Sequence, residues 1–285
     1  MIDPDTKILG VLGNPVKHSL SPLIQNIFIK SNNINAHYYC FEIEKQDICH
    51  IIKSANALGF LGFNITMPFK EIVMSYLDEI DEDAKETGSV NTVKFYGDKK
   101  ISKGFNTDGK GIIESIEKSG FGWEYSEILI LGAGGAAKSA VNSILKRPVK
   151  KIFIYNRTHD RALDLFQRSG KNADNRIEVL KNLGLKKDAI KRIKMIINCT
   201  PLGMKGVYAS EIPIPHNWDL KDKTVFEMVY HPFETPLIKK AKKEGAKTIK
   251  GIDMLINQAA YSFYVWFGIK PETEKVRKAV LDENR

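Results

Sequence analysis

Short apolar runs alternate with amphipathic stretches of helical length through the first third of the chain. The apolar runs predict strands at residues 7–12, 37–43, 62–65, 90–95 and 101–105, the last two joined as a hairpin around Gly97 and Asp98. The stretches between them predict helices at residues 22–30, 46–58 and 69–77. Ser21 is placed to cap the first helix, with Pro22 in its first turn. This order of elements predicts an α/β domain.

The same alternation continues in the second part of the chain. A helix is expected from Asp108 to Ser119, where Gly120 ends it. Further strands are expected at residues 127–131, 151–155, 195–198, 224–228 and 247–249, with helices at residues 136–145, 161–168 and 236–244 and a long apolar helix at 254–267. We therefore predict two α/β domains: residues 1–107 together with the C-terminal helical segment 252–285, and residues 108–251. The final helix is expected to pack back on the first domain, because the second sheet is complete without it.

Composition and charge narrow the class of protein. The chain has 285 residues, 43% of them hydrophobic, and a formal net charge of +9. A basic balance favours anionic partners, but no nucleic-acid-binding motif accompanies it. We interpret the densest basic group as a solvated helix face; it comprises Lys186, Lys187, Lys191, Arg192 and Lys194.

Cysteine usage and the apolar runs bear on location. The three cysteines form neither a disulfide framework nor a metal-ligand spacing, so we expect a reducing compartment and no metal. The N-terminus does not resemble a signal peptide, and no apolar run reaches the roughly 20 residues of a membrane span. A cytoplasmic protein with no membrane or nucleic-acid partner is expected.

A glycine turn follows the strand at residues 127–131. The segment Gly132-Ala133-Gly134-Gly135-Ala136-Ala137 fits the pattern G-x-G-x-x-A between a strand and a helix. The first glycine allows a tight turn, the second lets a pyrophosphate approach the backbone, and Ala137 keeps the helix close to the strand. The N–H groups at the start of the helix then face the phosphates. A Rossmann-like domain that binds a dinucleotide is predicted.

The end of the next strand selects the form of the dinucleotide. NAD-specific chains usually carry an acidic residue there, whereas this chain has Asn156-Arg157-Thr158, followed by Arg161. A planar guanidinium suits a 2′-phosphate, so NADP is the expected cofactor. The alternative is two ordinary surface arginines, and the nearby Asp160 keeps NAD open as a weaker cofactor.

Polar residues gather where strands of the first domain end. They are Ser19 and Ser21, Asn64, Thr66 and Lys70, Asn91, and Asn106 to Asp108. The crevice beyond strand ends binds ligands in α/β sheets, and these hydroxyls and amides suit a small polyhydroxylated acid. Helix capping and turn formation are the alternative roles for Ser21, Asn64 and Thr66.

Several motifs resemble those of one family. They are Gly13-Asn14-Pro15-x-x-His18-Ser19-x-Ser21-Pro22, Asn64-x-Thr66-x-Pro68-x-Lys70, Asn91-Thr92, Asn106-Thr107-Asp108-Gly109, the glycine turn, Asn156-Arg157-Thr158 and Gln258-Ala259-Ala260. In this order they resemble the shikimate dehydrogenases, from about residue 8 to residue 270.

The resemblance implies reversible NADP-linked reduction of 3-dehydroshikimate to shikimate, in chorismate and aromatic amino acid biosynthesis. It implies a small-molecule substrate and a monomer or homodimer. The implied catalytic pair is Lys70 and Asp108. The implied substrate-binding residues are Ser19, Ser21, Asn64, Thr66, Lys70, Asn91, Asp108, Tyr230 and Gln258. The implied cofactor contacts are Gly132, Ala133, Gly134, Gly135, Ala136, Asn156, Arg157, Thr158, Arg161, Met228 and Gly251.

Reduction of a ketone requires groups such as Lys70 and Asp108. When hydride reaches a ketone, the developing alkoxide requires a proton and nearby positive charge, and Lys70 supplies both. Asp108 would hold the ammonium in place. His18 is an alternative base, but no third group orients it, and a hydrogen-bonding role fits it better. For Tyr230, packing between domains is the alternative role.

Departures from the family pattern leave alternative functions open. Many relatives have an Asp where this chain has Glu227, and the basic segment 169–194 is long for a helix-to-strand connection. Short sequence motifs also resemble the quinate/shikimate dehydrogenase branch, which accepts quinate and often uses NAD. A dinucleotide-sensing regulator would need neither Lys70 nor Asp108, and a nucleic-acid-binding protein would leave the glycine turn unexplained.

Overall fold

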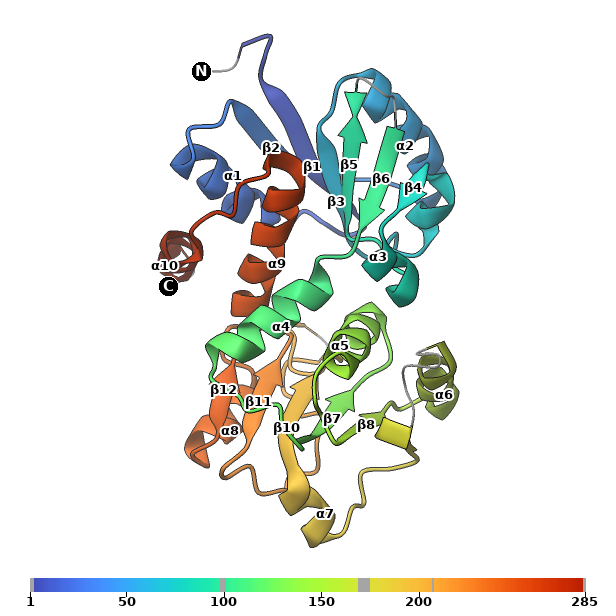
Figure 1. Cartoon of the computed structure of the whole chain (residues 1–285). Coiled ribbons are helices and arrows are strands. Elements are labelled where there is room, and N and C mark those ends of the chain that lie inside the picture. The colour runs from blue at the N-terminus through green and yellow to red at the C-terminus, as the bar shows by residue number, and fades with distance from the viewer. Residues whose placement is uncertain (1–2, 98–100, 169–174, 207, 284–285) are drawn as a thin grey trace. The chain divides into compact units, whose positions relative to one another are not determined.

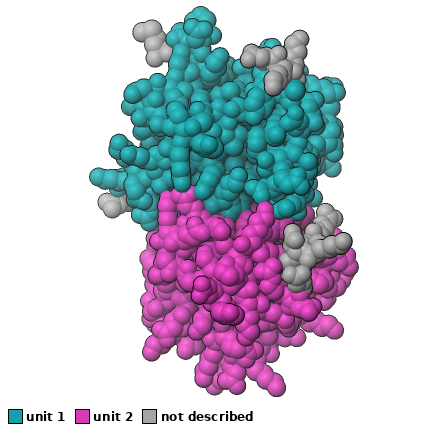
Figure 2. Space-filling model, in the orientation of Figure 1, with its two compact units in different colours: residues 1–111, 256–285 teal, residues 112–255 magenta. Residues whose placement is uncertain are grey.

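The computed structural model describes residues 3–97, 101–168, 175–206 and 208–283. Its chain divides into two compact units, residues 1–111 with 256–285 and residues 112–255 (Figure 2). The two boundaries fall inside helices, α4 (Asp108–Lys118) and α9 (Gly251–Phe267). Each unit has its own six-stranded sheet with helices packed on it (Figure 1). The predicted fold class, two α/β domains, is confirmed.

The first unit holds a mixed sheet in the order β2-β1-β3-β5-β6-β4. Its strands are β1 (Lys7–Gly13), β2 (Ala36–Glu42), β3 (Gly62–Ile65), β4 (Glu79–Ile80), β5 (Thr92–Tyr96) and β6 (Ile101–Phe105). Strands β1, β2 and β3 are parallel, and β5 is antiparallel to both β3 and β6. The ends of β1, β3 and β6 therefore meet the start of β5 at one edge of the sheet, and the predicted polar residues follow or precede these strands.

Helices cover both faces of this sheet because successive side chains of a strand point to opposite sides. One face packs on α2 (Ile48–Ala57) and the 3₁₀ helix η2 (Ile72–Tyr76), through a core that includes Phe63 and Val73. The other face meets α9, whose Trp266 donates from Nε1 to the Val93 carbonyl oxygen at 3.0 Å. Helices α1 (Ser21–Ser31) and α10 (Thr273–Glu283) contact each other, and α1 also packs on α9 through aromatic rings. Two short helices, η1 (Lys45–Asp47) and α3 (Glu82–Thr87), complete the unit.

The second unit is a parallel sheet in the order β12-β11-β10-β7-β8-β9. Its strands are β7 (Glu127–Leu131), β8 (Lys151–Tyr155), β9 (Ile177–Leu180), β10 (Ile193–Asn198), β11 (Thr224–Glu227) and β12 (Lys247–Ile249). Counted from β7, this is the doubly wound order 3-2-1-4-5-6, which reverses direction between β7 and β10. Ligands bind beyond the strand ends at such a reversal, so the order places a site at the end of β7.

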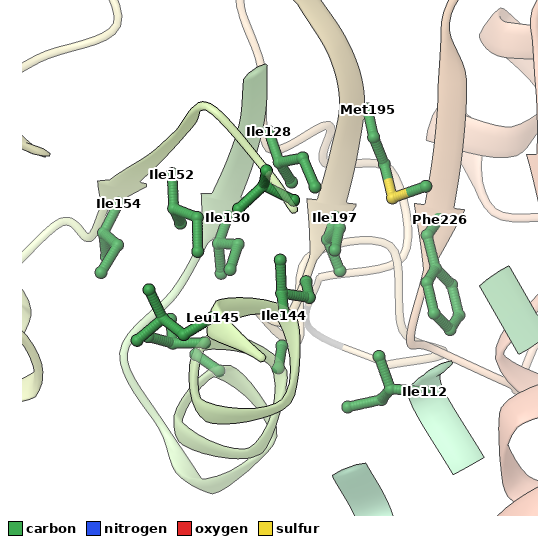
Figure 3. Close-up of a cluster of buried hydrophobic side chains, with 14 of the residues drawn as sticks. Ile112, Ile128, Ile130, Ile144, Leu145, Ile152, Ile154, Met195, Ile197 and Phe226 are labelled. Carbon is green, nitrogen blue, oxygen red and sulfur yellow. The ribbon is translucent and has the colours of Figure 1, made fainter. Parts of the chain in front are cut away.

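Fully buried aliphatic side chains hold α5 (Gly135–Leu145) against this sheet. Ile128, Ile130, Ile152 and Ile197 project from the strands toward Ile144 of the helix (Figure 3). Such a continuous apolar run is expected of strands covered on both faces. The remaining helices of the unit are α6 (His159–Arg168), α7 (Lys187–Arg192) and α8 (Pro236–Lys243).

Four sequence predictions about elements need correction. Ser21 does not cap α1: it is the first helical residue, and its N–H donates to Ser19 Oγ at 3.2 Å. Residues 69–77 form only a short 3₁₀ helix, because the Lys70 carbonyl accepts a hydrogen bond from Val90 N–H at 2.8 Å instead of continuing a helical ladder. The segment 169–194 is more than a connection, since it contains β9 and α7.

The fourth correction concerns the C-terminus. The long apolar helix α9 is not the last element, because α10 follows it and buries Val276 and Val280. Strand β4 and helix α3 also escaped prediction. Asp98 of the expected hairpin turn and residues 169–174 lie outside the described residues.

Candidate functional site

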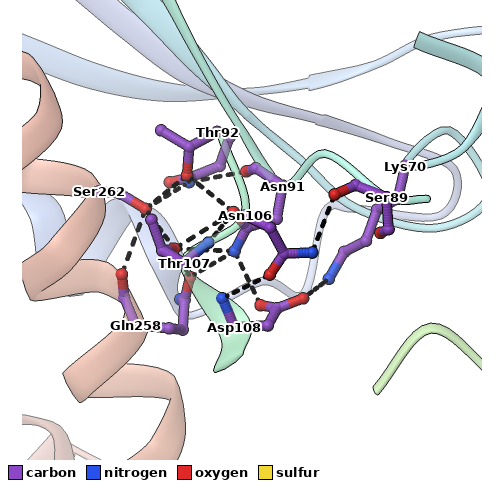
Figure 4. Close-up of polar contacts among 10 residues, drawn as sticks. Lys70, Ser89, Asn91, Thr92, Asn106, Thr107, Asp108, Gln258 and Ser262 are labelled. Carbon is purple, nitrogen blue, oxygen red and sulfur yellow. Dashed lines mark hydrogen bonds and ion pairs between the residues drawn. The ribbon is translucent and has the colours of Figure 1, made fainter. Parts of the chain in front are cut away.

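An ion pair lies at the edge where β1, β3 and β6 end. Lys70 Nζ lies 2.6 Å from Asp108 Oδ2 (Figure 4). Lys70 comes from the loop after β3, and Asp108 is the first residue of α4, directly after β6. The Asp108 side chain is 7% exposed and that of Lys70 is 23% exposed. The carboxylate is therefore buried while the ammonium keeps access to a ligand.

Asn91 fixes the other oxygen of that carboxylate. Its Nδ2 donates to Asp108 Oδ1 at 2.8 Å and to Thr107 Oγ1 at 2.9 Å, and lies 3.2 Å from Gln258 Oε1. Its Oδ1 accepts from Thr107 N–H at 2.8 Å, which settles the orientation of the amide. Asp108 is thus held on both oxygens.

Helix α9 contributes a second row of this network. Gln258 is predicted from sequence, but Ser262 is not, although it is fully buried. Ser262 Oγ lies 2.8 Å from Thr92 Oγ1 and 3.1 Å from Thr107 Oγ1. The available signal was a small polar residue one helical turn after Gln258 on an apolar helix. Ser262 therefore ties the first residue of β5, which directly follows Asn91, to the helix bearing Gln258.

Asn64 lies beneath the network rather than at its surface. Its Oδ1 accepts from Tyr38 Oη at 2.7 Å, and its Nδ2 donates to the Asn91 carbonyl oxygen at 3.0 Å and approaches Ser262 Oγ at 2.9 Å. Burial raises the pKa of Tyr38 well above its ordinary value, so that hydroxyl remains a donor. Both polar ends of the Asn64 side chain are occupied within the unit.

Three hydroxyls lie at the ends of β1 and β3. Ser19 is half-buried and caps the Ser21 N–H, while Ser21 is buried and Thr66 is half-buried. In the described part of the chain, the hydroxyls of Ser21 and Thr66 have no hydrogen-bond partner. His18 is exposed and does not join the Lys70 network. The two hydroxyls are therefore free to bind a ligand.

The glycine turn stands between β7 and α5, at the reversal of strand order. Gly132 has a φ of 110°, and a Cβ on it would lie 3.1 Å from the Cys199 carbonyl oxygen, so only glycine fits without strain. A Cβ at Gly134 or Gly135 would meet no protein atom within 4 Å. No side chain caps the N-terminus of α5. An open backbone cradle with free N–H groups fits a pyrophosphate.

The neighbouring residues of the turn differ in role. Ala137 is fully buried in the core, as its packing role requires, whereas Ala133 and Ala136 are half-buried at the rim.

The tip of β8 is basic and open. Asn156 Nδ2 donates to the Thr158 carbonyl oxygen at 2.8 Å, which shapes the turn into α6. Arg157, Thr158, Arg161 and Asp160 are exposed. Neither guanidinium forms an ion pair with any described residue. Two unpaired cations beside the glycine turn fit a phosphate group, although Asp160 is close in sequence.

Met228 and Tyr230 follow β11, in the same unit as the glycine turn. Burial raises the pKa of Tyr230. Gly251 begins α9 and packs on this segment: a Cβ there would lie 2.6 Å from the carbonyl oxygens of Met228 and Val229. Gly251 therefore has a packing reason to be glycine. The preceding Glu227, which was noted only as a family departure, is 1% exposed.

The described residues contain no group of three or more His, Cys, Asp or Glu side chains arranged to hold a metal ion. None of the helices in the described ranges is both long and apolar enough to cross a membrane. Cys40, Cys49 and Cys199 are free, half-buried thiols.

Comparison with known proteins places the chain in a family. A family model described as the shikimate dehydrogenase substrate binding domain matches residues 11–93. A model described as shikimate / quinate 5-dehydrogenase matches residues 115–203, and one described as the shikimate 5′-dehydrogenase C-terminal domain matches residues 251–281.

Individual relatives agree over the full length. The shikimate dehydrogenase (NADP+) of Methanococcus maripaludis is 38% identical over 283 residues, covering 99% of this chain and all (100%) of the relative. A crystal structure of a shikimate dehydrogenase in complex with NADP+ matches with a TM-score of 0.90 and 35% identity, covering 99% of this chain and 97% of that chain. The quinate dehydrogenase of Corynebacterium glutamicum in complex with NAD matches with a TM-score of 0.89 and 26% identity, covering 97% and 99%. The chain belongs to the shikimate dehydrogenase family.

Proposed function

We propose that this chain catalyses the reversible, NADP-linked reduction of 3-dehydroshikimate to shikimate, a step of chorismate and aromatic amino acid biosynthesis. The observation that carries the proposal is the Lys70–Asp108 ion pair, buried on its acidic side and open on its basic side. The family membership and the open glycine cradle of the second unit support it. The unit with residues 1–111 and 256–285 would bind substrate, and the unit with residues 112–255 would bind the cofactor.

The nicotinamide, when bound, supplies or accepts the hydride. Lys70 places an ammonium where negative charge develops on the ketone oxygen and donates the proton that makes it an alcohol. In the reverse direction the same nitrogen takes the hydroxyl proton. Asp108 holds this nitrogen in place through its 2.6 Å contact, and Asn91 in turn holds Asp108. We assign the catalytic roles to Lys70 and Asp108.

The remaining polar groups would bind the substrate. The unpartnered hydroxyls of Ser21 and Thr66, with Ser19, suit a carboxylate or a ring hydroxyl, and no acidic residue stands in the first turn of α1 to oppose an anion. Asn91 and Gln258 present amides beside Asp108. Asn64 supports these groups from below, and Tyr230 is a further substrate-binding residue that the family resemblance implies.

We infer the cofactor-binding residues from the family resemblance, and the geometry of the second unit supports the inference. The turn from Gly132 to Ala136 would receive the pyrophosphate, because its N–H groups are uncapped and its glycines leave space. Asn156, Arg157, Thr158 and Arg161 would hold the adenosine 2′-phosphate. Met228 and Gly251 would contact the cofactor farther along the sheet.

The setting of the activity follows the chemistry. The ligands are small molecules, and the dispersed lysines leave nucleic acid without a defined binding face. We propose a cytoplasmic location, as suits a biosynthetic enzyme that uses NADP, and a monomer or homodimer.

Quinate oxidation with NAD is the second candidate. The exposed Asp160, which follows Arg157 closely in sequence, favours it, since an acidic side chain at this tip can bind ribose hydroxyls. The fold does not discriminate, because the quinate dehydrogenase matches as well as the shikimate dehydrogenase does. A dinucleotide-sensing regulator is disfavoured by the Lys70–Asp108 pair.

A direct assay tests the proposed activity. Purified protein mixed with shikimate and NADP+ is expected to produce the near-ultraviolet absorbance of the reduced cofactor, and 3-dehydroshikimate with NADPH should consume it. No change in either direction, with a protein that binds NADP, would contradict the proposal.

A further inference from the structure

A carboxyl group is buried at the end of β11, the strand beside the edge strand β12 of the second sheet. Glu227 is 1% exposed, and both of its oxygens accept hydrogen bonds. Oε1 accepts from Asn198 Nδ2 at 2.8 Å and from Val229 N–H at 3.0 Å, and Oε2 accepts from Thr235 Oγ1 at 2.9 Å. Burial of an acidic group is costly unless the group is hydrogen-bonded in this way.

These bonds join three separate segments of the chain. Asn198 ends β10, and its Oδ1 accepts from Thr200 N–H at 3.0 Å. Thr200 is part of the wall against Gly132, since a Cβ on Gly132 would lie 3.3 Å from Thr200 Cγ2. Thr235 caps α8 by accepting from Ile238 N–H at 3.3 Å. Glu227 therefore links the wall of the glycine turn to the start of α8.

The third segment is residues 228–230. Backbone hydrogen bonds of Met228 and Val229 hold it, and Gly251 packs against it. Met228 N–H donates to the Asn198 carbonyl oxygen at 3.0 Å, and Val229 N–H donates to Glu227 itself. The backbone of Gly251 packs directly against the carbonyls of Met228 and Val229. The segment has little freedom as long as the Glu227 carboxyl group is present.

We propose that Glu227 is a positioning residue that fixes residues 228–230, and through them the part of the dinucleotide site remote from the 2′-phosphate. The inference rests on the proposed function. Strand order gives the direction: β8, with Arg157 at its tip, and β11 lie on opposite sides of the reversal between β7 and β10. A dinucleotide spans this crevice, so the β11 side receives the nicotinamide half when the β8 side holds the adenosine.

The surroundings explain why a neutral replacement of the same shape should serve. Burial raises the pKa of Glu227 to about 7, against the hydrogen bonds that lower it. Cys199 directly follows β10, and the pKa of its thiol is raised by burial and by the charge of Glu227. Ile249 of β12 is the register partner of Phe226, and Lys250 follows it. Lys250 forms an ion pair with Glu234, which precedes α8. A glutamine can keep accepting from Asn198 and Val229 while its amide nitrogen donates to Thr235.

Binding measurements on the full chain separate the two halves of the site. We would measure dissociation constants for NADP+ and for 2′,5′-ADP, which carries the 2′-phosphate but lacks the nicotinamide. Glu227→Ala should weaken NADP+ binding by about tenfold or more, the scale of a misplaced binding group, and leave 2′,5′-ADP binding unchanged. Glu227→Gln should restore NADP+ binding. Glu178→Ala, at an exposed glutamate on β9 paired with Lys151, is the matched control and should change neither.

Two results would overturn the inference: an equal loss of both ligands in a folded Glu227→Ala protein, or undiminished NADP+ binding in that variant. If Glu227→Ala does not fold, Asn198→Ala carries the test, because it removes one of the three donors to Glu227, together with the acceptor for Thr200 N–H, and leaves the donors Val229 and Thr235 in place. The same selective loss is expected, and unchanged NADP+ binding would overturn the inference. A wild-type protein that binds NADP+ but does not oxidise shikimate would contradict the proposed function while leaving this binding test intact.

Discussion

Lys70 Nζ and Asp108 Oδ2 lie 2.6 Å apart, although 38 positions separate the two residues in the chain. The contact arises because β3 and β6 end at the same edge of one sheet, so the loop after the first and the helix after the second meet there. Asn91, at the start of the strand between them, bonds the second oxygen of Asp108. The sheet topology thus brings the Lys70 ammonium to the Asp108 carboxylate, although the two residues belong to separate sequence motifs.

Removal of the Lys70 ammonium should impair the chemical step. For Lys70→Ala we expect kcat to fall by about 10²–10⁴-fold, the range for loss of a positioned acid–base group, while KM for shikimate changes much less. Steady-state kinetics measure both constants. Lys85→Ala, at an exposed lysine of α3 paired with Glu82, is the control and should retain wild-type kinetics. Full activity of Lys70→Ala would remove Lys70 from the mechanism.

Arg157 should determine the preference for the phosphorylated cofactor. Its guanidinium is exposed and unpaired among the described residues, so it is available to the 2′-phosphate. Arg157→Ala should raise KM for NADP by about 10–100-fold, as expected for loss of a charge-assisted pair, and leave KM for NAD nearly unchanged. Lys194→Ala removes an equal charge from an exposed position of β10 and should not alter the ratio. An unaltered NADP preference in Arg157→Ala would contradict the assignment.

Gly134 should matter for binding and not for folding. Its φ of −86° suits any residue, and an added Cβ would meet no protein atom within 4 Å. Gly134→Ala should therefore fold with unchanged thermal stability but bind NADP at least about tenfold more weakly, because the methyl group fills the pyrophosphate cradle. Calorimetry of unfolding and of binding checks both halves. Gly122→Ala, at another open glycine, is the control; wild-type NADP affinity in Gly134→Ala would exclude this cradle.

The buried Glu227 should make stability depend on pH. Its pKa rises from 4.5 to about 7 on folding, so between these values the folded state holds a proton that the unfolded state has released. Stability relative to Glu227→Gln should therefore fall as pH rises through this window and stay level above it. At about 1.4 kcal/mol per pKa unit, the change is at most about 3–4 kcal/mol. Urea unfolding of both proteins at pH values below, within and above the window measures it, and parallel pH profiles would contradict the cause.

Features with a local pattern were predictable from sequence. The glycine turn, the basic tip after β8 and the helix beginning at Asp108 each rest on neighbouring residues and were found where expected. Some elements with local signals were missed, including α3, where Asp81 accepts from Asp83 N–H as an N-cap. The short β9 was obscured by the polar stretch around it.

Contacts between distant segments could not be predicted. Ser262 meets Thr92 across 170 positions, and Tyr38 meets Asn64 across 26, with no periodicity to pair them. Local propensity also failed at residues 69–77, where the Lys70 carbonyl bonds to Val90 instead of a helical partner. Both cases involve hydrogen bonds that exist only after the sheet has formed.

The proposed function is tested most directly by comparing kcat/KM for shikimate and quinate, each with NADP and with NAD. Shikimate with NADP is expected to give the largest value, because Arg157 favours the phosphorylated cofactor and the chain matches a shikimate dehydrogenase (NADP+) over its full length. A clearly larger value for quinate with NAD would contradict the assignment to shikimate biosynthesis.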